Sequence, residues 1–177
     1  AVYGRLAGWV SDTLRKENQV VINQINLSVD SYLRTIMRLS DSLYYGVIKN
    51  ADYQAEAEMV DSEMMLLYDN NKDFVSNIAL LSRDGELLSA VPAARLKTDL
   101  DVTEEKWFKD TLEHSENLHF SMPHVQYIFD SSGNQYRWVI TLSRAVEVTK
   151  GTSTSQGVLL IDMTYESLRY MLDNISL

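Results

Sequence analysis

Residues 9–45 read WVSDTLRKENQVVINQINLSVDSYLRTIMRLSDSLYY and contain neither glycine nor proline. Nothing in the stretch therefore forces a helix to stop. Apolar side chains recur at steps of three or four residues, which is the spacing of one helical face. Those positions are Val21, Ile25, Val29, Tyr32, Ile36, Leu39, Leu43 and Val47. The pattern predicts one long helix, capped near Ser11 or Asp12 and weakened after Gly46.

A single helix over residues 9–45 would be about 55 Å long at 1.5 Å per residue. A compact domain of 177 residues is only roughly 35 Å across. We therefore expect one end of the helix to extend beyond the globular body. An extended helix needs a partner, either a second copy of itself or a membrane from which it rises.

The composition is that of an ordinary globular domain, with 45% hydrophobic and 23% charged residues. The net charge of −9 argues against nucleic acid as a partner, because phosphate contacts need clustered Lys and Arg. The absence of cysteine excludes disulfides, thiolate metal sites and a cysteine nucleophile. No run of eighteen apolar residues is present, so no stretch of the sequence predicts a membrane span.

The middle of the chain predicts a second helix and then a hairpin. The second helix starts after the potential cap Asp52 and ends at the turn formers of residues 69–73. Apolar runs at 74–81 and 87–91 flank Asp84-Gly85, which is a strong hairpin signal. Residues 93–102 read as a loop with some helical character.

The second half predicts a short helix, further strands and a final helix. Thr103 is the expected N-cap of the short helix, which carries Trp107 and Phe108. Strands are expected at 118–122 and 125–129, around Pro123, and at 136–148 and 157–163, with a polar loop at 150–155. Residues 165–174 predict the last helix.

This order predicts an α+β fold, with a five-stranded antiparallel sheet and the long N-terminal helix packed along one face. Residues 1–72 would supply the long helix and the second helix. Residues 73–177 would supply the sheet, the short helix over it and the C-terminal helix. Both parts are expected to belong to one domain.

No catalytic constellation can be named, so the sequence predicts a fragment without enzymatic activity. None of the seven glycines forms a phosphate-binding pattern. His114, His119 and His124 are five residues apart and share no helical face, so we expect them at the surface or half-buried, with no metal or cofactor. The acids of residues 69–73 read as a solvated turn and not as a calcium loop.

Asp162 is the most informative acid, because it lies in the apolar strand Val158-Leu159-Leu160-Ile161-Asp162-Met163. A buried carboxylate is costly unless it is paired or hydrogen-bonded. Asp162 could cap the last helix or meet an internal arginine, with Arg144 as its natural counterpart. It could instead anchor a ligand in a cavity beside the sheet. Trp107 and Phe108 could likewise be core residues or a lid over that cavity.

Taken in order, these features resemble the extracellular Cache (PDC, PAS-like) sensor domain of bacterial receptors. The resemblance rests on the long helix, the hairpin at 83–86, the Trp107-Phe108 helix, the turn at 130–133 and the strands at 139–146 and 157–163. The sequence of residues 121–126, SMPHVQ, and that of the strand at 136–148 are most similar to sensor regions of Gram-positive two-component histidine kinases.

The resemblance implies an extracellular or periplasmic sensor module that binds a small molecule and transmits a conformational change through its long helix. That helix would start near a membrane span and pair in a homodimer, so the only membrane contact would be through flanking segments outside this sequence. The chain would be a membrane-distal module, and a second module could follow Leu177. The ligand-binding candidates are Trp107, Phe108, His124, Tyr127, Arg144 and Asp162.

The family's amino-acid-binding pattern is only partly present. Trp107 and Asp162 match it, but Glu105 stands where the pattern has an arginine and Phe108 replaces a tyrosine. Standard recognition of an α-amino acid is therefore not expected. The alternative to a ligand sensor is a structural, dimerising or protein-binding module whose cavity is filled by its own side chains.

Overall fold

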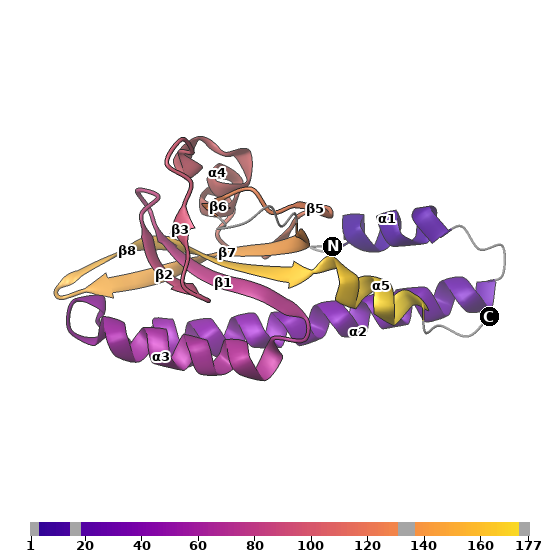
Figure 1. Cartoon of the computed structure of the whole chain (residues 1–177), viewed down its shortest axis with the longest axis horizontal. Helices are drawn as coiled ribbons and strands as arrows, with labels where there is room; N and C mark the ends of the chain where they lie inside the picture. The colour runs from indigo at the N-terminus through magenta and orange to yellow at the C-terminus, as the bar shows by residue number, and fades with distance from the viewer. Residues whose placement is uncertain (1–3, 15–18, 131–136, 174–177) are drawn as a thin grey trace.

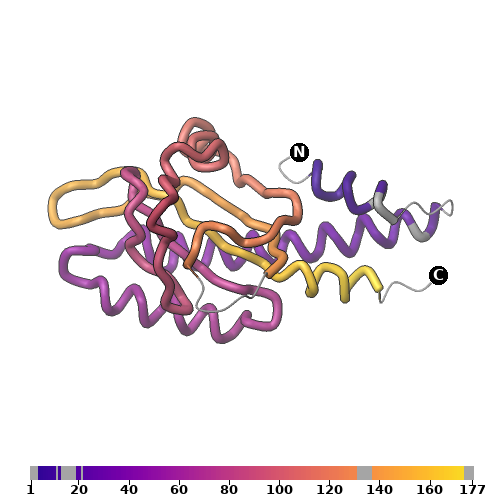
Figure 2. The backbone as a smooth tube through the Cα atoms, turned by 45° about the horizontal axis from the view of Figure 1, so that its top comes forward, coloured from indigo at the N-terminus to yellow at the C-terminus, as the bar shows by residue number. Residues whose placement is uncertain are grey.

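The computed structural model describes residues 4–14, 19–130 and 137–173, and Figures 1 and 2 show their arrangement. The helices are α1 (Gly4–Leu14), α2 (Gln19–Leu43), the π-helical segment η1 (Tyr44–Ile48), α3 (Tyr53–Asn71), the 3-10 turn η2 (Val102–Glu104), α4 (Lys106–Glu113) and α5 (Tyr165–Asp173). The strands are β1 (Val75–Ser82), β2 (Leu87–Val91), β3 (Arg95–Leu96), β4 (His119–Phe120), β5 (His124–Val125), β6 (Phe129–Asp130), β7 (Trp138–Lys150) and β8 (Ser153–Thr164).

The main sheet is antiparallel and has the order β2-β1-β8-β7, with both β4 and β5 paired to the outer side of β7. Within the described residues the main sheet therefore has six strands, and β4 and β5 share one edge position. The sequence predicted five strands. The edge is interrupted at Pro123, which has no N–H to donate to a ladder. β3 and β6 form a separate two-stranded sheet, in which β3 lies in the stretch predicted as a loop and β6 lies at the end of the strand predicted at 125–129.

Helices cover both faces of the main sheet. α2 and α3 lie along one face and α4 lies over the other (Figure 1). The larger core lies between α2 and the sheet, where Leu33 and Ile36 of α2 and Ile140 and Ile161 of the sheet are all fully buried. Burial of this apolar stripe is the main driving force that holds α2 against the sheet.

The predicted helix over residues 9–45 is wrong as a single element. α1 and α2 are separate helices that lie side by side (Figure 1), and residues 15–18 between them lie outside the described part. The apolar stripe quoted above begins only at Val21, so it never extended into α1. Packing α1 against α2 buries Leu6 and Val10, which a straight rod would have left in water.

The expected extension beyond the globular body is nevertheless present. α2 runs along the long axis of the molecule, and its N-terminal part continues past the sheet (Figures 1 and 2). α1 and α5 pack against that part of α2. In the described part of the chain, none of the helices combines the length and the apolar character that crossing a bilayer requires.

Local turn chemistry agrees with the sequence at two places and differs at two others. The Asp52 carboxylate caps α3, accepting hydrogen bonds from the N–H groups of Gln54 (3.0 Å) and Gly151 (2.7 Å). Gly85 adopts φ of 84° in the predicted hairpin. Asp101, and not Thr103, caps the turn before α4. The Thr103 N–H donates a hydrogen bond to Asp101 Oδ1 at 3.0 Å. The polar stretch 150–155 is not a loop, because β7 and β8 stay paired up to Lys150 and Ser153.

The α2 helix widens into the π-helical segment η1 where it passes the sheet. The Lys49 N–H donates to the Tyr44 carbonyl oxygen at 2.8 Å, a spacing of five residues. The Tyr44 hydroxyl accepts a hydrogen bond from the Glu147 N–H of β7 at 3.0 Å. Short π-helical segments are uncommon in proteins, but those that occur often lie at functional sites.

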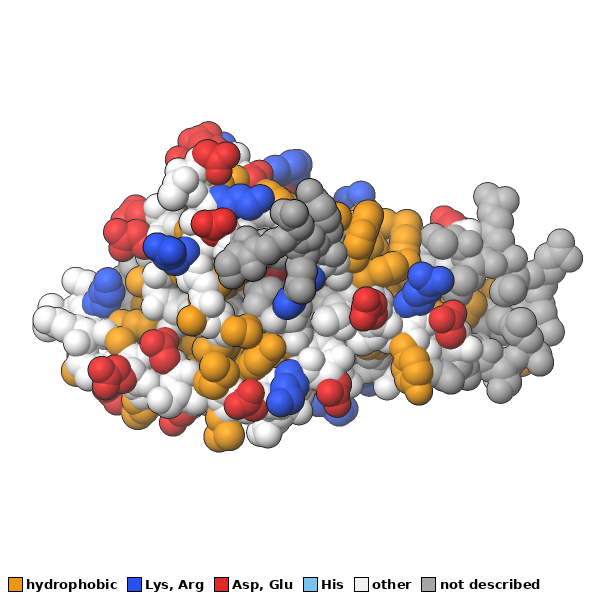
Figure 3. Space-filling view, in the orientation of Figure 1, with side chains coloured by type: hydrophobic (Ala, Val, Ile, Leu, Met, Phe, Trp, Pro, Cys, Tyr) orange, Lys and Arg blue, Asp and Glu red, His pale blue; other side chains and the backbone are white. Residues whose placement is uncertain are grey.

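The face of the molecule in Figure 3 carries a mixture of acidic and basic side chains. Lys and Arg side chains are spread among Asp and Glu, and several acidic side chains stand over α4. Charges of both signs are thus interspersed on this face, while the sequence as a whole carries a net charge of −9.

Candidate functional site

Strand alternation selects the residues that face away from α2. On β8, Leu160 and Asp162 point to the α4 side, while Ile161 belongs to the α2 core. Thr141 of β7 lies directly opposite Asp162 in the antiparallel register, so the two side chains share a face. The α4 side of the sheet therefore combines an apolar floor with a carboxylate and a hydroxyl.

Asp162 is buried, with 2% of its surface exposed. The Thr141 hydroxyl donates a hydrogen bond to Asp162 Oδ1 at 2.5 Å. Burial raises the pKa of the Asp162 carboxyl to about 6, and the Thr141 hydrogen bond, the nearby His124 and the Asn77 amide partly oppose that rise. Asn77 lies opposite Asp162 in the register of β1 and β8, and its buried Nδ2 has no hydrogen-bond partner among the described residues. Asp162 is thus a desolvated carboxyl, and none of these neighbouring groups is an arginine or a lysine.

The interpretation of Asp162 as a helix cap is wrong. α5 begins at Tyr165, and the Ser167 N–H donates to Thr164 Oγ1 at 3.4 Å. Thr164 therefore occupies the capping position, and the Asp162 side chain is left to face the α4 side of the sheet.

His124 is held beside this pair by the chain on both sides of Pro123. Its Nδ1 lies 2.9 Å from the Met122 carbonyl oxygen, so that nitrogen carries the hydrogen and donates. Its Nε2 lies 3.4 Å from Thr141 Oγ1. The Ser121 hydroxyl lies 3.2 Å from His124 Nδ1 and accepts a hydrogen bond from the Thr141 N–H at 2.8 Å. These contacts fix the imidazole in one orientation.

Trp107 of α4 supplies the aromatic wall. Its indole N–H donates to the Tyr127 hydroxyl at 3.0 Å, which fixes the orientation of the ring. The Tyr127 ring lies 6.0 Å from the His124 ring at an interplanar angle of 64°. Burial, followed by the nearby Glu105 carboxylate, raises the pKa of the Tyr127 hydroxyl, so it stays protonated at neutral pH.

These side chains line a partly open cavity of about 340 Å³ between the sheet and α4. Its size falls in the range of roughly 300–1,000 Å³ that is usual for small-molecule sites. The lining residues are Arg5, Trp107, Asp110, His119, Phe120, Ser121, His124, Gln126, Tyr127, Ile128, Thr141, Ser143, Leu160 and Asp162.

Four of the six residues selected from the sequence come together in this cavity: Trp107, His124, Tyr127 and Asp162. Phe108 does not line it. Its side chain is 2% exposed and packs with Leu81, Val102 and Val158 in a small core beneath α4. Consecutive residues on a helix point about 100° apart, so α4 directs Trp107 to the cavity and Phe108 to that core.

The interpretation of Arg144 as the counterpart of Asp162 is wrong. Arg144 pairs with Leu159 in the register, which places it on the α2 face of the sheet. Its Nη1 donates to Asp41 Oδ1 at 2.7 Å and to Ser40 Oγ at 3.1 Å. Its guanidinium also lies 5.1 Å and 5.5 Å from the ring centroids of Tyr44 and Tyr45. Arg144 therefore links β7 to the helix at η1.

Replacing Arg144 by Met should remove this link and destabilise the domain by about 1–2 kcal/mol. The lost terms are an ion pair with an exposed aspartate and cation–π contacts, each worth roughly 0.5–1 kcal/mol. Amide hydrogen exchange should accelerate specifically at residues 40–48. Arg34→Met is the matched control, because in the described part of the chain Arg34 forms an exposed pair with Asp30 (2.8 Å) on the same helix and no link to the sheet. Equal effects of the two changes would contradict the assigned role of Arg144.

Several lining residues escaped the sequence reasoning. Asp110 lies three positions after Trp107 on α4, so helical spacing alone could have found it. Ser121 and Gln126 belong to the SMPHVQ segment that carried the resemblance, but nothing in their type marks them as ligand contacts. Arg5 comes from α1, whose return along α2 had no signal in the sequence.

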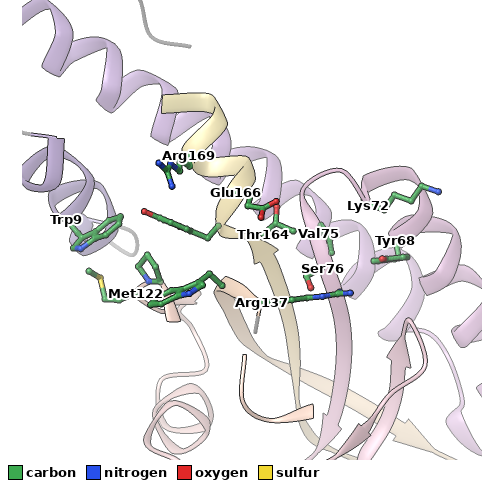
Figure 4. Close-up of a pocket in the computed structure, with 13 residues that line it drawn as sticks. Trp9, Tyr68, Lys72, Val75, Ser76, Met122, Arg137, Thr164, Glu166 and Arg169 are labelled. Atoms are coloured by element: carbon green, nitrogen blue, oxygen red, sulfur yellow. The ribbon is translucent and has the colours of Figure 1, made fainter. Parts of the chain in front are cut away.

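A second and larger hollow, of about 710 Å³, lies where α1, α5 and the end of the sheet meet (Figure 4). Trp9, Arg137 and Arg169 lie around it, and Trp9 and Trp138 each pack against Tyr165, with ring centroids 6.3 Å and 6.4 Å apart. Trp138 is 53% exposed, so this hollow is an open surface feature. The smaller cavity is the better candidate site, because a buried carboxyl and several neutral polar groups converge in it.

Within the described residues, no three His, Asp or Glu side chains come close enough together to hold a metal ion.

Comparison with known proteins identifies the fold. No family model and no curated protein matches the sequence. The sensory domain of the Campylobacter jejuni chemoreceptor Tlp3 with isoleucine bound superposes with a TM-score of 0.63 at 18% identity over 99% of this chain. The ligand-binding domain of the Pseudomonas aeruginosa chemoreceptor PctC in complex with GABA gives 0.62 at 19% identity over 84%. The Pseudomonas fluorescens chemoreceptor CtaA with L-valine gives 0.56 at 16% identity over 82%.

The chain therefore has the fold of chemoreceptor ligand-binding domains, in keeping with the resemblance found in the sequence. It spans 66% of the length of the Tlp3 domain, 64% of that of PctC and 59% of that of CtaA. At these identities the likeness concerns the fold alone.

Proposed function

We propose that this chain is the extracytoplasmic ligand-sensing domain of a membrane-bound receptor and binds a small molecule between the sheet and α4. The observation that carries the proposal is the cavity of about 340 Å³ in which Asp162 is buried beside Trp107, Tyr127 and His124. Its occurrence in a fold shared with chemoreceptor ligand-binding domains supports a sensing role. We propose that the parent protein is a histidine kinase of a two-component system, because the sequence of residues 121–126 is similar to sensor regions of such kinases.

A thermal-shift screen of the purified domain, with calorimetry on the hits, tests this proposal. The panel contains free amino acids, amines, organic acids and neutral sugars. Trp107→Ala and Asp162→Ala should each weaken a hit at least about tenfold, or 1.4 kcal/mol, because each removes a large contact inside the cavity. Trp138→Ala is the matched control, since Trp138 lines the second hollow.

Two results of this screen would count against the proposal. Hits that respond to Trp138→Ala and not to Trp107→Ala would place binding in the second hollow. The absence of any hit would favour a structural or protein-binding module of a membrane receptor.

Transmission would run through α2, which contacts the sheet and extends beyond it. A ligand can shift the arrangement of α2 only if it binds one arrangement more tightly than another. Arg144 and the Tyr44 hydroxyl join β7 to the η1 segment, and the adjacent Ser143 lines the cavity. The cavity and the helix are thus connected through one strand.

We also propose a homodimer through α2. Val20 and Leu27 on α2 are 63% and 70% exposed and are seven residues apart, so they share one helical face. Leu27→Glu should lower the sedimentation coefficient to that of a monomer, because a buried charge would oppose pairing. Leu66→Glu, at an equally exposed position on α3, is the control and should leave the coefficient unchanged. A monomeric wild-type domain at high concentration would refute the dimer.

A further inference from the structure

We infer that the cavity takes a neutral polyhydroxylated ligand, such as one or two sugar rings, and not an amino acid, an amine or an organic acid. This inference rests on the proposed function and names the ligand class of the same site. It follows from the charges that line the cavity, from the types of hydrogen-bonding group in its wall, and from the way its aromatic ring is held.

Among the described residues, no buried cation lines the cavity. The charged residues in the lining are Arg5, Asp110 and Asp162, apart from the two histidines. The Asp110 carboxylate is paired with Lys106 at 2.5 Å, which leaves one arginine and one carboxyl. An anionic ligand would face the Asp162 carboxyl without a buried cation to compensate its charge, and such a charge is costly. A neutral ligand carries no such cost.

A zwitterion has no evident place for its carboxylate. In the amino-acid pattern of the resembling family, an arginine stands two positions before the tryptophan, and this chain has Glu105 there. Burial and, after it, the negative charge of the Glu105 carboxylate raise the pKa of Tyr127, so Glu105 acts at the cavity wall. Arg5 is exposed on α1, and Arg144 lies on the opposite face of the sheet. Within the described residues, no buried lysine or arginine faces the cavity.

The neutral groups of the wall both donate and accept hydrogen bonds. The Gln126 side-chain carbonyl accepts from the Phe129 N–H at 2.9 Å, so its NH₂ group remains as a donor. The Ser121 hydroxyl accepts from the Thr141 N–H and keeps its own hydrogen to donate. Asp162 supplies an acceptor. An ammonium only donates and a carboxylate only accepts, whereas each hydroxyl of a sugar does both.

The aromatic wall offers carbon surface and little polarity. The Trp107 N–H is already bound to the Tyr127 hydroxyl, so the indole presents its ring to the cavity and not its donor. A sugar ring combines an apolar C–H face with polar edges, and it can stack on an indole while its hydroxyls reach the sheet. A cavity of about 340 Å³ is small, which favours a mono- or disaccharide over a longer chain.

Calorimetry on the whole 177-residue domain tests the inference, with neutral mono- and disaccharides as probes. For the tightest sugar, the corresponding amino sugar and uronic acid are compared, because the three differ mainly in charge. L-Valine and GABA are included as amino-acid probes. The neutral sugar should bind at least tenfold more tightly than its charged derivatives and than either amino acid. Its affinity should not change between low and high salt, because no ion pair holds it.

Variants locate the binding. Gln126→Ala and Trp107→Ala should each weaken the sugar at least tenfold, while Gln24→Ala, on the exposed side of α2, should leave its affinity unchanged. Tighter binding of L-valine, GABA or an amino sugar, lost in Trp107→Ala, would overturn the ligand class and leave the sensing function standing. No binding by any probe would overturn the ligand class and the sensing function together.

Discussion

Replacing Ile161 by Ala should lower the free energy of unfolding by about 4 kcal/mol, within the 2–5 kcal/mol usual for buried aliphatic truncations. Ile161 is fully buried in β8, between β1 and β7, and faces the α2 core. Close packing on all sides prevents the neighbours from filling the space that three missing carbons would leave. Urea denaturation followed by circular dichroism measures the change.

Leu160→Ala is the matched comparison, because Leu160 is the preceding residue, is 1% exposed and lines the ligand cavity. Its truncation enlarges an existing hollow and creates no new closed one, so the cost should be at the low end of the range, about 2 kcal/mol. Leu160→Ala should also alter the affinity of any ligand, whereas Ile161→Ala should not. A larger loss of stability for Leu160→Ala would contradict the assignment of the two faces.

The long-range order of the fold could be predicted because its signals are repeated over many residues. In the apolar stripe from Ile25 to Val47, many residues predict the same helix. In the apolar run of β8, several residues predict the same strand. The separation of α1 from α2 could not be predicted, since no glycine or proline marks it and tertiary burial of Leu6 and Val10 favours it. Propensity and pattern alone do not report such a choice.

The turn between β7 and β8 determines on which face of the sheet Arg144 lies. β7 and β8 stay paired up to Lys150 and Ser153, so only Gly151 and Thr152 form the turn. A two-residue hairpin fixes the register of both strands, and this one places Thr141 opposite Asp162 and Arg144 opposite Leu159. Interpreting residues 150–155 as a loop discarded that constraint, and with it the correct face for Arg144.

The cavity could be predicted only in part, for a related reason. Asp162 and Trp107 are conspicuous because each is unusual in its element, a carboxyl in an apolar strand and an indole on a short helix. Ser121 and Gln126 are ordinary polar residues of an irregular edge, and their inward direction depends on the interruption at Pro123. No periodicity describes such a segment, so sequence alone cannot assign its side chains to a face.

Asp162 should make the domain less stable as the pH rises from 4 to 6. The carboxyl has a pKa of about 6 in the folded protein, against 3.8 as its ordinary value. Between these values the folded state holds a proton that the unfolded state has lost, so unfolding becomes more favourable as the pH increases. The difference in pKa corresponds to a loss on the order of 3 kcal/mol, complete above pH 6 and absent below pH 4.

Asp162→Asn removes this titration and keeps the shape of the side chain. Urea unfolding at pH 4, 5, 6 and 7 should therefore show the stability of the wild type falling relative to Asp162→Asn across the window, with little change from pH 6 to 7. Other carboxyl groups titrate equally in both proteins and cancel in the difference. Asp99→Asn, at an exposed position, is the control and should run parallel to the wild type. Parallel curves for Asp162→Asn as well would show that the carboxyl is solvated or ion-paired, and the cavity would then lack the desolvated acceptor on which its proposed chemistry depends.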